Sequence, residues 1–149
     1  MAAPRPPHRN CAAGSNTFPD AKAAGVVLWT GDGDFLIGYQ PQRQCKWSEP
    51  GGKRRPGESV MACAKRELRE ETGLCSDTTD GLTIQWGTPT YIADCKYVFF
   101  QGRIGKGRPA TSTTFSEYKF VPLSGIPSNS SFRLQRVAHF LRHGAAGER

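Results

Sequence analysis

The chain has 149 residues, of which 37% are hydrophobic, and its charges are mixed along its length, which indicates one globular domain rather than a disordered chain. No window approaches 18 consecutive apolar residues, so the sequence predicts no membrane span. The formal net charge of +7, with much of the excess in residues 103–149, suits an anionic partner such as a nucleotide, a polyphosphate or RNA, although a basic surface that only maintains solubility explains it equally well.

The N-terminal segment is basic and contains no acid before Asp20, which would suit an organelle transit peptide. Pro4, Pro6 and Pro7 disfavour the amphipathic helix that such a peptide needs, so we expect residues 1–20 to be a disordered tail. The five cysteines are odd in number and form no C-x-x-C pair, which disfavours a disulfide framework or a zinc site. A reducing compartment, and hence a cytoplasmic protein, is therefore the prediction, with an organelle as the alternative.

The domain is expected over residues 21–143, followed by a short C-terminal tail at 144–149. A β-hairpin is predicted first, then a loop rich in proline and glycine, and then a helix from the N-cap Ser59 to Thr72 with Gly73 after its last turn. The hairpin strands and the later strands are predicted at residues 26–29, 35–37, 82–86, 90–93, 96–104 and 117–123.

A second helix is predicted over residues 131–143, with Phe132, Val137, Phe140 and Leu141 facing the core. The order of the elements is hairpin, helix, several strands and helix. It predicts an α/β or α+β fold in which a mixed β-sheet is sandwiched between helices.

The helix at residues 59–72 carries acids where its apolar stripe should continue. The stripe begins at Val60, and Glu67 continues the same sector, with Glu70 and Glu71 beside it. A solvated helix end is the ordinary explanation of such acids. Glu67 and Glu71 nevertheless form a like-charged i, i+4 pair near the negative end of the helix dipole, which a lone helix disfavours. Converging carboxylates favour a bound cation, and oxygen-only ligands indicate a hard one such as Mg²⁺.

The same stretch matches the signature of a protein family. The positions that resemble a complete Nudix box, at the family's spacing, are Gly52, Glu58, Arg66-Glu67-Leu68, Glu70-Glu71 and Gly73-Leu74. The hairpin before the box and the strands and helix after it follow the order of the Nudix fold. The resemblance therefore extends over residues 21–143.

The resemblance implies a hydrolase that uses Mg²⁺ or Mn²⁺ and water to cleave a nucleoside diphosphate linked to another moiety. It implies that Glu70, Glu71 and the carbonyl of Gly51 bind the metal, and that Glu67 either binds metal or acts as the general base. Family members often recruit a further acid beyond the box, for which Glu117 is the candidate because it opens a predicted strand.

Arg66 and Glu58 are implied to pair and hold the helix and loop together, with Glu58 near the metal as an alternative. Lys53, which adjoins the box glycine Gly52, is expected to contact the polyphosphate. For Arg54 and Arg55 a solvated basic loop is at least as good an explanation.

Trp47 is a candidate for stacking on a base, although an aromatic before a turn more often packs internally. The tripeptide 50–52, Pro-Gly-Gly, resembles MutT-type nucleoside triphosphate hydrolases, whereas Pro89 and Tyr91 resemble markers of two different substrates and cancel as evidence.

We therefore expect a MutT-like enzyme that releases a nucleoside monophosphate and pyrophosphate. The alternatives are hydrolysis of a dinucleoside polyphosphate, a nucleotide sugar, ADP-ribose or an RNA cap. From another class, the alternative is a catalytically silent Nudix-fold module that binds RNA or a nucleotide. Such modules have usually lost some of the box glutamates, all of which this chain keeps.

Overall fold

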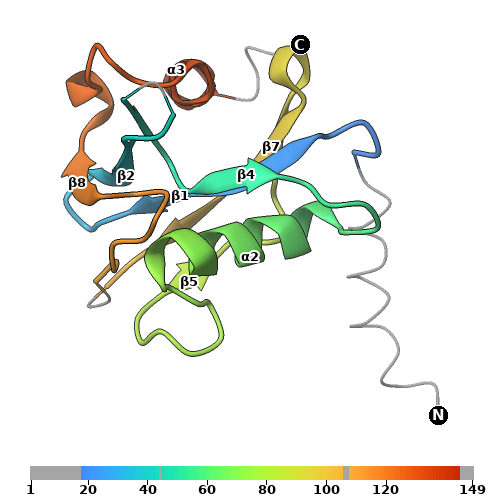
Figure 1. Cartoon of the computed structure of the whole chain (residues 1–149), viewed down its shortest axis with the longest axis horizontal. Coiled ribbons are helices and arrows are strands. Elements are labelled where there is room, and N and C mark those ends of the chain that lie inside the picture. The colour runs from blue at the N-terminus through green and yellow to red at the C-terminus, as the bar shows by residue number, and fades with distance from the viewer. Residues whose placement is uncertain (1–17, 44, 106–107, 145–149) are drawn as a thin grey trace.

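A computed structural model describes residues 18–43, 45–105 and 108–144, and within them a mixed β-sheet lies between two helices (Figure 1). The elements are β1 (Ala23–Trp29), β2 (Phe35–Gln40), β3 (Lys46–Ser48), β4 (Gly51–Lys53), α2 (Val60–Thr72), β5 (Thr83–Ile84), β6 (Thr90–Ile92), β7 (Tyr97–Arg103), β8 (Glu117–Val121) and α3 (Phe132–His143), with short 3₁₀ turns at Ala93–Cys95 and Leu123–Gly125. The expected α+β class, with a sheet between helices, is confirmed.

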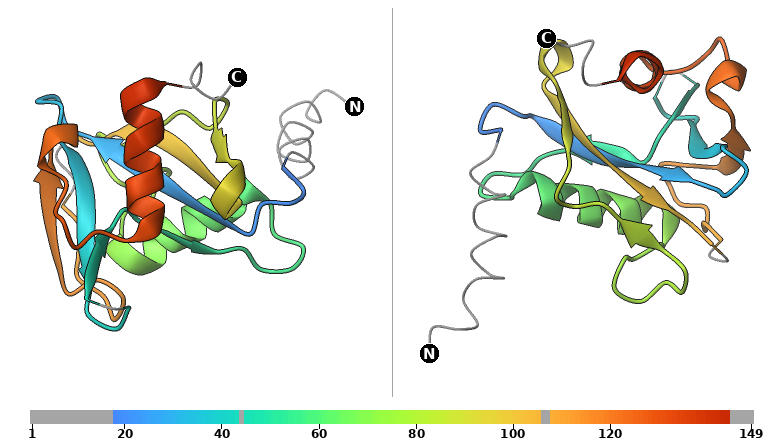
Figure 2. Two further views of the ribbon diagram at one scale, coloured as in Figure 1. Left: turned by 90° about the horizontal axis from the view of Figure 1, so that it is seen from above. Right: turned by 180° about the vertical axis from the view of Figure 1, so that it is seen from behind.

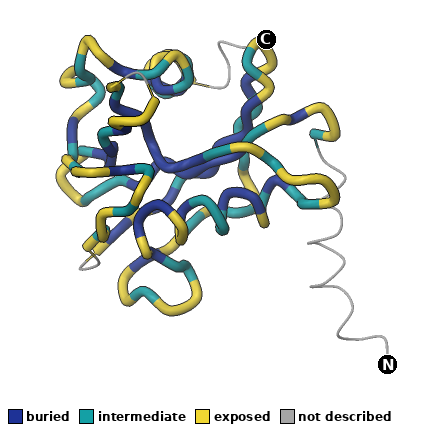
Figure 3. Tube along the Cα trace, in the orientation of Figure 1, coloured by how far each residue is buried: buried dark blue, intermediate teal, exposed yellow. Residues whose placement is uncertain are grey.

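Strand β1 is the centre of the sheet. It pairs in parallel with β7 along its whole length, and it pairs antiparallel with β2 and with β4. Strand β8 adds to the far edge of β2. Because both faces of β1 are covered, its middle residues Val26, Val27 and Leu28 are all fully buried, as the dark central strands in Figure 3 illustrate.

Two apolar cores lie on opposite faces of the sheet. Alternation along β1 sends Val26 and Leu28 toward α2, where they join a cluster with Leu68. Val27 points the other way and packs with Leu134 of α3. The two helices accordingly cover different faces, as the view from above and the view from behind show (Figure 2).

Helix α2 has the ends that its sequence predicts. The side chain of Ser59 accepts a hydrogen bond of 3.0 Å from the N–H of Ala62, which caps the first turn. At the other end Gly73 adopts a left-handed conformation with φ of 76°, and its N–H donates to the carbonyl of Arg69. Local signals therefore fix the helix that carries the acidic residues.

Three expectations need correction. The segment predicted as a loop after β2 contains β3 and β4, because the backbone at Gly51 and Gly52 pairs with β1 despite the low strand propensity of glycine. The strand predicted at 82–86 is only two residues long, at Thr83–Ile84. Phe132, predicted to face the core, is 61% exposed, because it begins α3 on the side away from Leu134.

The expected tails at residues 1–20 and 144–149 lie almost wholly outside the described residues. Phe18 is described, and its ring packs on that of Tyr91 with centroids 5.3 Å apart. Neither helix in the described part of the chain has the length and apolar character that a membrane span needs.

Because β1 lies very close to the chain just before β4, any side chain at Gly25 should destabilise the fold. A Cβ at Gly25 would collide with the carbonyl oxygen of Pro50 and the hydroxyl of Tyr97, and would lie 2.8 Å from the Cα of Gly51. We expect Gly25→Ala to lower the free energy of unfolding by about 1–3 kcal/mol, the usual cost of overpacking a core. Urea denaturation measures this, with Gly87→Ala as the control because a Cβ at Gly87 meets nothing within 4 Å. Equal stability of the two variants would contradict the prediction.

Candidate active site

Gly52, Arg66 and the three acids of the box line one cavity between the acidic half of α2 and strand β4. The cavity has a volume of about 670 Å³. Its floor includes Glu67, Glu70 and Glu71 from α2, and Gly51 lies on its β4 side. The remaining lining residues are Gln40, Arg43, Gly52, Lys53, Arg54, Arg55, Pro56, Arg66 and Thr114. Three carboxylates therefore face a rim of basic side chains.

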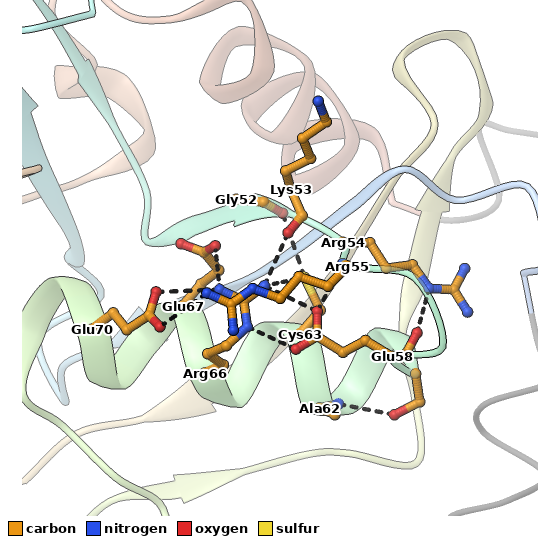
Figure 4. A network of polar contacts seen from close by, with 11 residues as sticks. Gly52, Lys53, Arg54, Arg55, Glu58, Ala62, Cys63, Arg66, Glu67 and Glu70 are labelled. Atoms are coloured by element: carbon orange, nitrogen blue, oxygen red, sulfur yellow. Dashed lines mark hydrogen bonds and ion pairs between the residues drawn. The ribbon is translucent and has the colours of Figure 1, made fainter.

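Arg66 connects the acidic helix to the loop before it (Figure 4). Its guanidinium forms two contacts with Glu58, of 2.7 Å from Nε to Oε2 and 2.9 Å from Nη2 to Oε1. Nη2 also donates to the carbonyl of Lys53 at 3.0 Å. The hydrogen bond from Arg66 holds the pKa of Glu58 below its usual value. Glu58 is not among the residues that line the acidic cavity, so its observed partner is Arg66.

The same guanidinium reaches two of the box carboxylates. Nη1 of Arg66 lies 2.9 Å from Oε2 of Glu67 and 3.2 Å from Oε1 of Glu70 (Figure 4). Glu70 is the more exposed of the two and also pairs with Arg55 at 3.7 Å. Arg66 thus offsets the mutual repulsion of neighbouring acids, and its hydrogen bonds, first to Glu58 and then to Glu67, raise its own pKa although burial opposes the shift.

Glu67 explains the glycine that opens the box. Its carboxylate packs against the Cα of Gly52, and a Cβ at Gly52 would lie only 2.5 Å from both oxygens of Glu67. Any side chain at this position would displace the carboxylate from the cavity floor.

Glu71 is the buried member of the acidic group, with 4% of its surface exposed. The N–H of Gly51 donates a 2.8 Å hydrogen bond to its Oε1, and the hydroxyl of Tyr118 donates to its backbone carbonyl. Burial raises the pKa of the Glu71 carboxyl to about 8, although the charge of Arg133 and the Gly51 hydrogen bond oppose the shift. The shift therefore favours the protonated form of this carboxyl at neutral pH in the metal-free protein.

The donor set fits a hard divalent ion. It consists of three carboxylates and the Gly51 backbone, all with oxygen ligands, and the pKa of Glu71 falls when a cation is near. Among the described residues, no three acidic, histidine or cysteine side chains stand close enough together to hold an ion as they are. Glu67 and Glu70 each contact Arg66 through one carboxylate oxygen, so the other oxygen of each side chain makes no contact with this arginine.

Two residues proposed from the sequence lie outside this cavity. Glu117 opens β8, and alternation along the strand puts Tyr118 on the α2 face but Glu117 and Lys119 on the α3 face. Trp47 is 8% exposed, packs on Tyr39 in the α3-side core and carries the Lys119 ammonium over its ring. Trp47 thus packs internally and Glu117 lies outside the lining of the acidic cavity, while the functional roles expected of both stay predictions.

A buried ion pair behind the cavity is not predictable from the local sequence. Glu49 is fully buried and its Oε2 lies 2.7 Å from Nε of Arg133 on α3. The two residues are 84 positions apart, and Glu49 stands in a segment predicted as a loop, so no local pattern could have paired them. The signal that remains is a charged residue directly before the Pro-Gly-Gly turn.

Comparison with known proteins agrees with the geometry. The model of the NUDIX domain family matches residues 19–141. An RNA pyrophosphohydrolase of Dinoroseobacter shibae is 35% identical over 92 residues, which are 61% of this chain and 56% of that protein. The human 8-oxo-dGDP phosphatase NUDT18 is 22% identical over 125 residues, which are 80% of this chain and 37% of that protein. The chain thus spans about half or less of the length of these curated relatives.

Solved structures share the fold. A crystal structure of a C. elegans Ap4A hydrolase binary complex superposes with a TM-score of 0.64 at 20% identity, covering 85% of this chain and 98% of that one. A MutT protein from Methanosarcina mazei superposes with a TM-score of 0.56 at 23% identity, covering 83% and 94%.

Glu71 should make the metal-free protein less stable as the pH rises. The pKa of its carboxyl is about 8 when folded and 4.5 in the reference state, so between these values the folded chain binds more protons than the unfolded one. The free energy of unfolding then falls with rising pH, by at most about 1.4 kcal/mol per pH unit from this group. Urea denaturation with a chelator between pH 5 and pH 8 measures the slope. Glu71→Gln should flatten it relative to the unsubstituted protein, and parallel slopes would contradict the assignment.

Proposed function

The chain belongs to the NUDIX domain family of hydrolases, and on that premise we propose that it uses a divalent metal ion to cleave a nucleoside triphosphate to the monophosphate and pyrophosphate. One observation carries the proposal: the three carboxylates of Glu67, Glu70 and Glu71 line a single cavity whose rim is basic. Carboxylates suit a cation, and basic side chains suit the phosphates that the same ion binds.

Each group has a role in this proposal. Glu70, Glu71 and the Gly51 carbonyl would hold Mg²⁺ or Mn²⁺, which neutralises phosphate oxygens and lowers the pKa of a bound water. Lys53 contacts the polyphosphate. Water attacks a phosphorus atom, the bond to the leaving pyrophosphate oxygen breaks, and the proton of the water passes to Glu67. Glu67 is assigned as the base because its carboxylate lies on the cavity floor, held against Gly52, and Glu117 does not line the cavity.

A second candidate substrate is the triphosphate at the 5′ end of an RNA. A further cavity of about 580 Å³ shares Gln40 and Arg43 with the acidic one, so a chain bound at its triphosphate could continue into it. Lys46 and the exposed ring of Phe132 line this second cavity. Cations and an exposed aromatic ring suit the backbone and bases of a single strand. The relative named as an RNA pyrophosphohydrolase points the same way.

A substrate panel tests the reaction class. Normal and oxidised nucleoside triphosphates, dinucleoside polyphosphates, ADP-ribose, nucleotide sugars, capped RNA and 5′-triphosphate RNA would each be incubated with Mg²⁺, and the products identified by chromatography. Monophosphate and pyrophosphate from a triphosphate are the expected products. Tight binding of a nucleotide or RNA by folded protein, with no turnover of any compound, would instead favour the silent binding module.

Loss of an outer-shell partner of a metal typically lowers activity by about 10- to 100-fold. Glu70→Gln removes a proposed ligand, so it should reduce turnover by more than this. The amide removes one charge and one ion ligand while the exposed position tolerates the change. Glu117→Gln, which removes the same charge from an exposed position outside the cavity, is the matched control and should retain activity. Steady-state rates at fixed Mg²⁺ compare the two. An equal loss in both variants would restore Glu117 to the site.

Phe132→Ala should separate the two substrate classes. Loss of the ring should remove the stacking of one base, which is usually worth about 1–3 kcal/mol, and should lower kcat/KM for 5′-triphosphate RNA accordingly. The kcat/KM for the free triphosphate should stay unchanged. Rates for an oligonucleotide and for the matching free nucleoside triphosphate provide the comparison. Equal effects on both substrates would argue against an RNA strand in the second cavity.

A further inference from the structure

The start of α3 is hydrogen-bonded to strand β3, which comes just before β4 in the chain. The N–H of Trp47 donates to the carbonyl of Asn129 at 3.0 Å, and the N–H of Ser131 donates to the carbonyl of Trp47 at 2.8 Å. The hydroxyls of Ser48 and Ser131 lie 2.9 Å apart. Helix α3 is therefore joined to β3, although it lies on the opposite face of the sheet from α2.

The Glu49–Arg133 pair extends this junction toward the site. Besides the 2.7 Å contact with the Glu49 carboxylate, Nη2 of Arg133 donates to the Glu49 carbonyl at 2.8 Å and to the Ser48 hydroxyl at 3.2 Å. The other carboxylate oxygen of Glu49 accepts from Ser48 at 3.0 Å. One guanidinium thus fixes both the side chain and the backbone of Glu49, two residues before Gly51.

Tyr97 of β7 packs against both Arg133 and Gly51. The Arg133 guanidinium lies over its ring at 4.8 Å, and its buried hydroxyl would be 2.5 Å from a Cβ at Gly51. On its other side, the Gly51 N–H is bonded to Glu71. The Gly51 peptide is therefore held between Tyr97 and the buried carboxylate.

Stability alone gives a poor account of this arrangement. Removing two charges from water often costs more free energy than their mutual attraction provides. An apolar pair of similar size would therefore stabilise the fold at least as well. What the ion pair adds is direction, because Arg133 donates to three polar groups of one short segment, namely the carboxylate and the carbonyl of Glu49 and the hydroxyl of Ser48.

We propose that Glu49 and Arg133, backed by Tyr97, are positioning residues that set the backbone of Gly51 relative to Glu71, so that the Gly51 carbonyl and the Glu71 carboxylate face the same cation. The inference rests on the proposed function, because it takes these two groups as metal ligands. Neither Glu49 nor Arg133 lines the acidic cavity, so neither would bind the ion itself, and both would hold the backbone of Gly51 in place.

The double variant Glu49→Leu/Arg133→Met tests this role. It removes both charges together, so the net charge is unchanged and no unpaired charge stays buried. Mn²⁺ binding, measured by calorimetry without any substrate, should weaken by about 10- to 100-fold, the range found when outer-shell partners of a metal are lost. The midpoint of thermal unfolding should stay close to that of the unsubstituted protein.

The matched control is Asp94→Leu/Arg136→Met. Arg136 lies one turn further along α3, and its Nε is 3.0 Å from Asp94 in a more exposed ion pair. This variant makes the same chemical change on the same helix without touching the segment before Gly51, so its Mn²⁺ affinity should be unchanged. A folded Glu49→Leu/Arg133→Met protein with unchanged Mn²⁺ affinity, or with the same loss as the control, would overturn the proposal.

If the double variant does not fold, Arg133→Lys replaces it. Lysine keeps the charge but cannot reproduce the forked contacts with Glu49 and Ser48, so the same weakening is expected, and unchanged affinity overturns the role. Failure of the proposed function has a different signature. Unsubstituted protein that binds no Mn²⁺ would refute the metal site itself, whereas Mn²⁺ binding without turnover of any tested compound would refute only the reaction.

Discussion

The carboxylates on one face of α2 repel one another, and the other residues of the site are arranged to offset this repulsion. Glu67, Glu70 and Glu71 line one cavity, and a helix surface alone would push such acids apart. The guanidinium of Arg66 offsets this repulsion, and Glu58 in turn orients the guanidinium through two parallel hydrogen bonds. This ion pair is 11–14% exposed, so solvent screens it far less than a surface salt bridge. The loop that carries Glu58 is thereby joined to the helix that carries the ligands.

Close backbone packing supplies the second half of the site. Strand β4 pairs with β1 at Gly51 and Gly52, which puts glycine backbone where a side chain would collide with Glu67 or Tyr97. The segment contains residues that rarely form strands, yet it pairs with β1 on one side and bonds to Glu71 through the Gly51 N–H on the other. The backbone at Gly51 is thus positioned by the sheet, which is more rigid than a free loop.

Local signals made α2 predictable, and distant contacts made the rest difficult. Ser59 and Gly73 mark both ends of the helix in the sequence itself, and the box spacing identifies the acids that line the cavity. Strands β3 and β4 exist through pairing with β2 and β1, which outweighs the propensities of Pro50 and its glycine neighbours. The face on which Glu117 lies depends on strand register, and a shift of one residue would have reversed it.

Two arginines on different helices act on the same acidic group in different ways. Arg66 contacts Glu67 and Glu70 directly, so it competes with an ion for these carboxylates. Arg133 acts through space on Glu71, whose pKa its charge lowers, and through contact on the segment before Gly51. The acids are thus offset by Arg66 on the open side and by Arg133 behind them, and burial favours the neutral form of Glu71 by raising its pKa. A divalent ion bound among these acids would favour loss of the Glu71 proton, because a nearby positive charge lowers the pKa of a carboxyl.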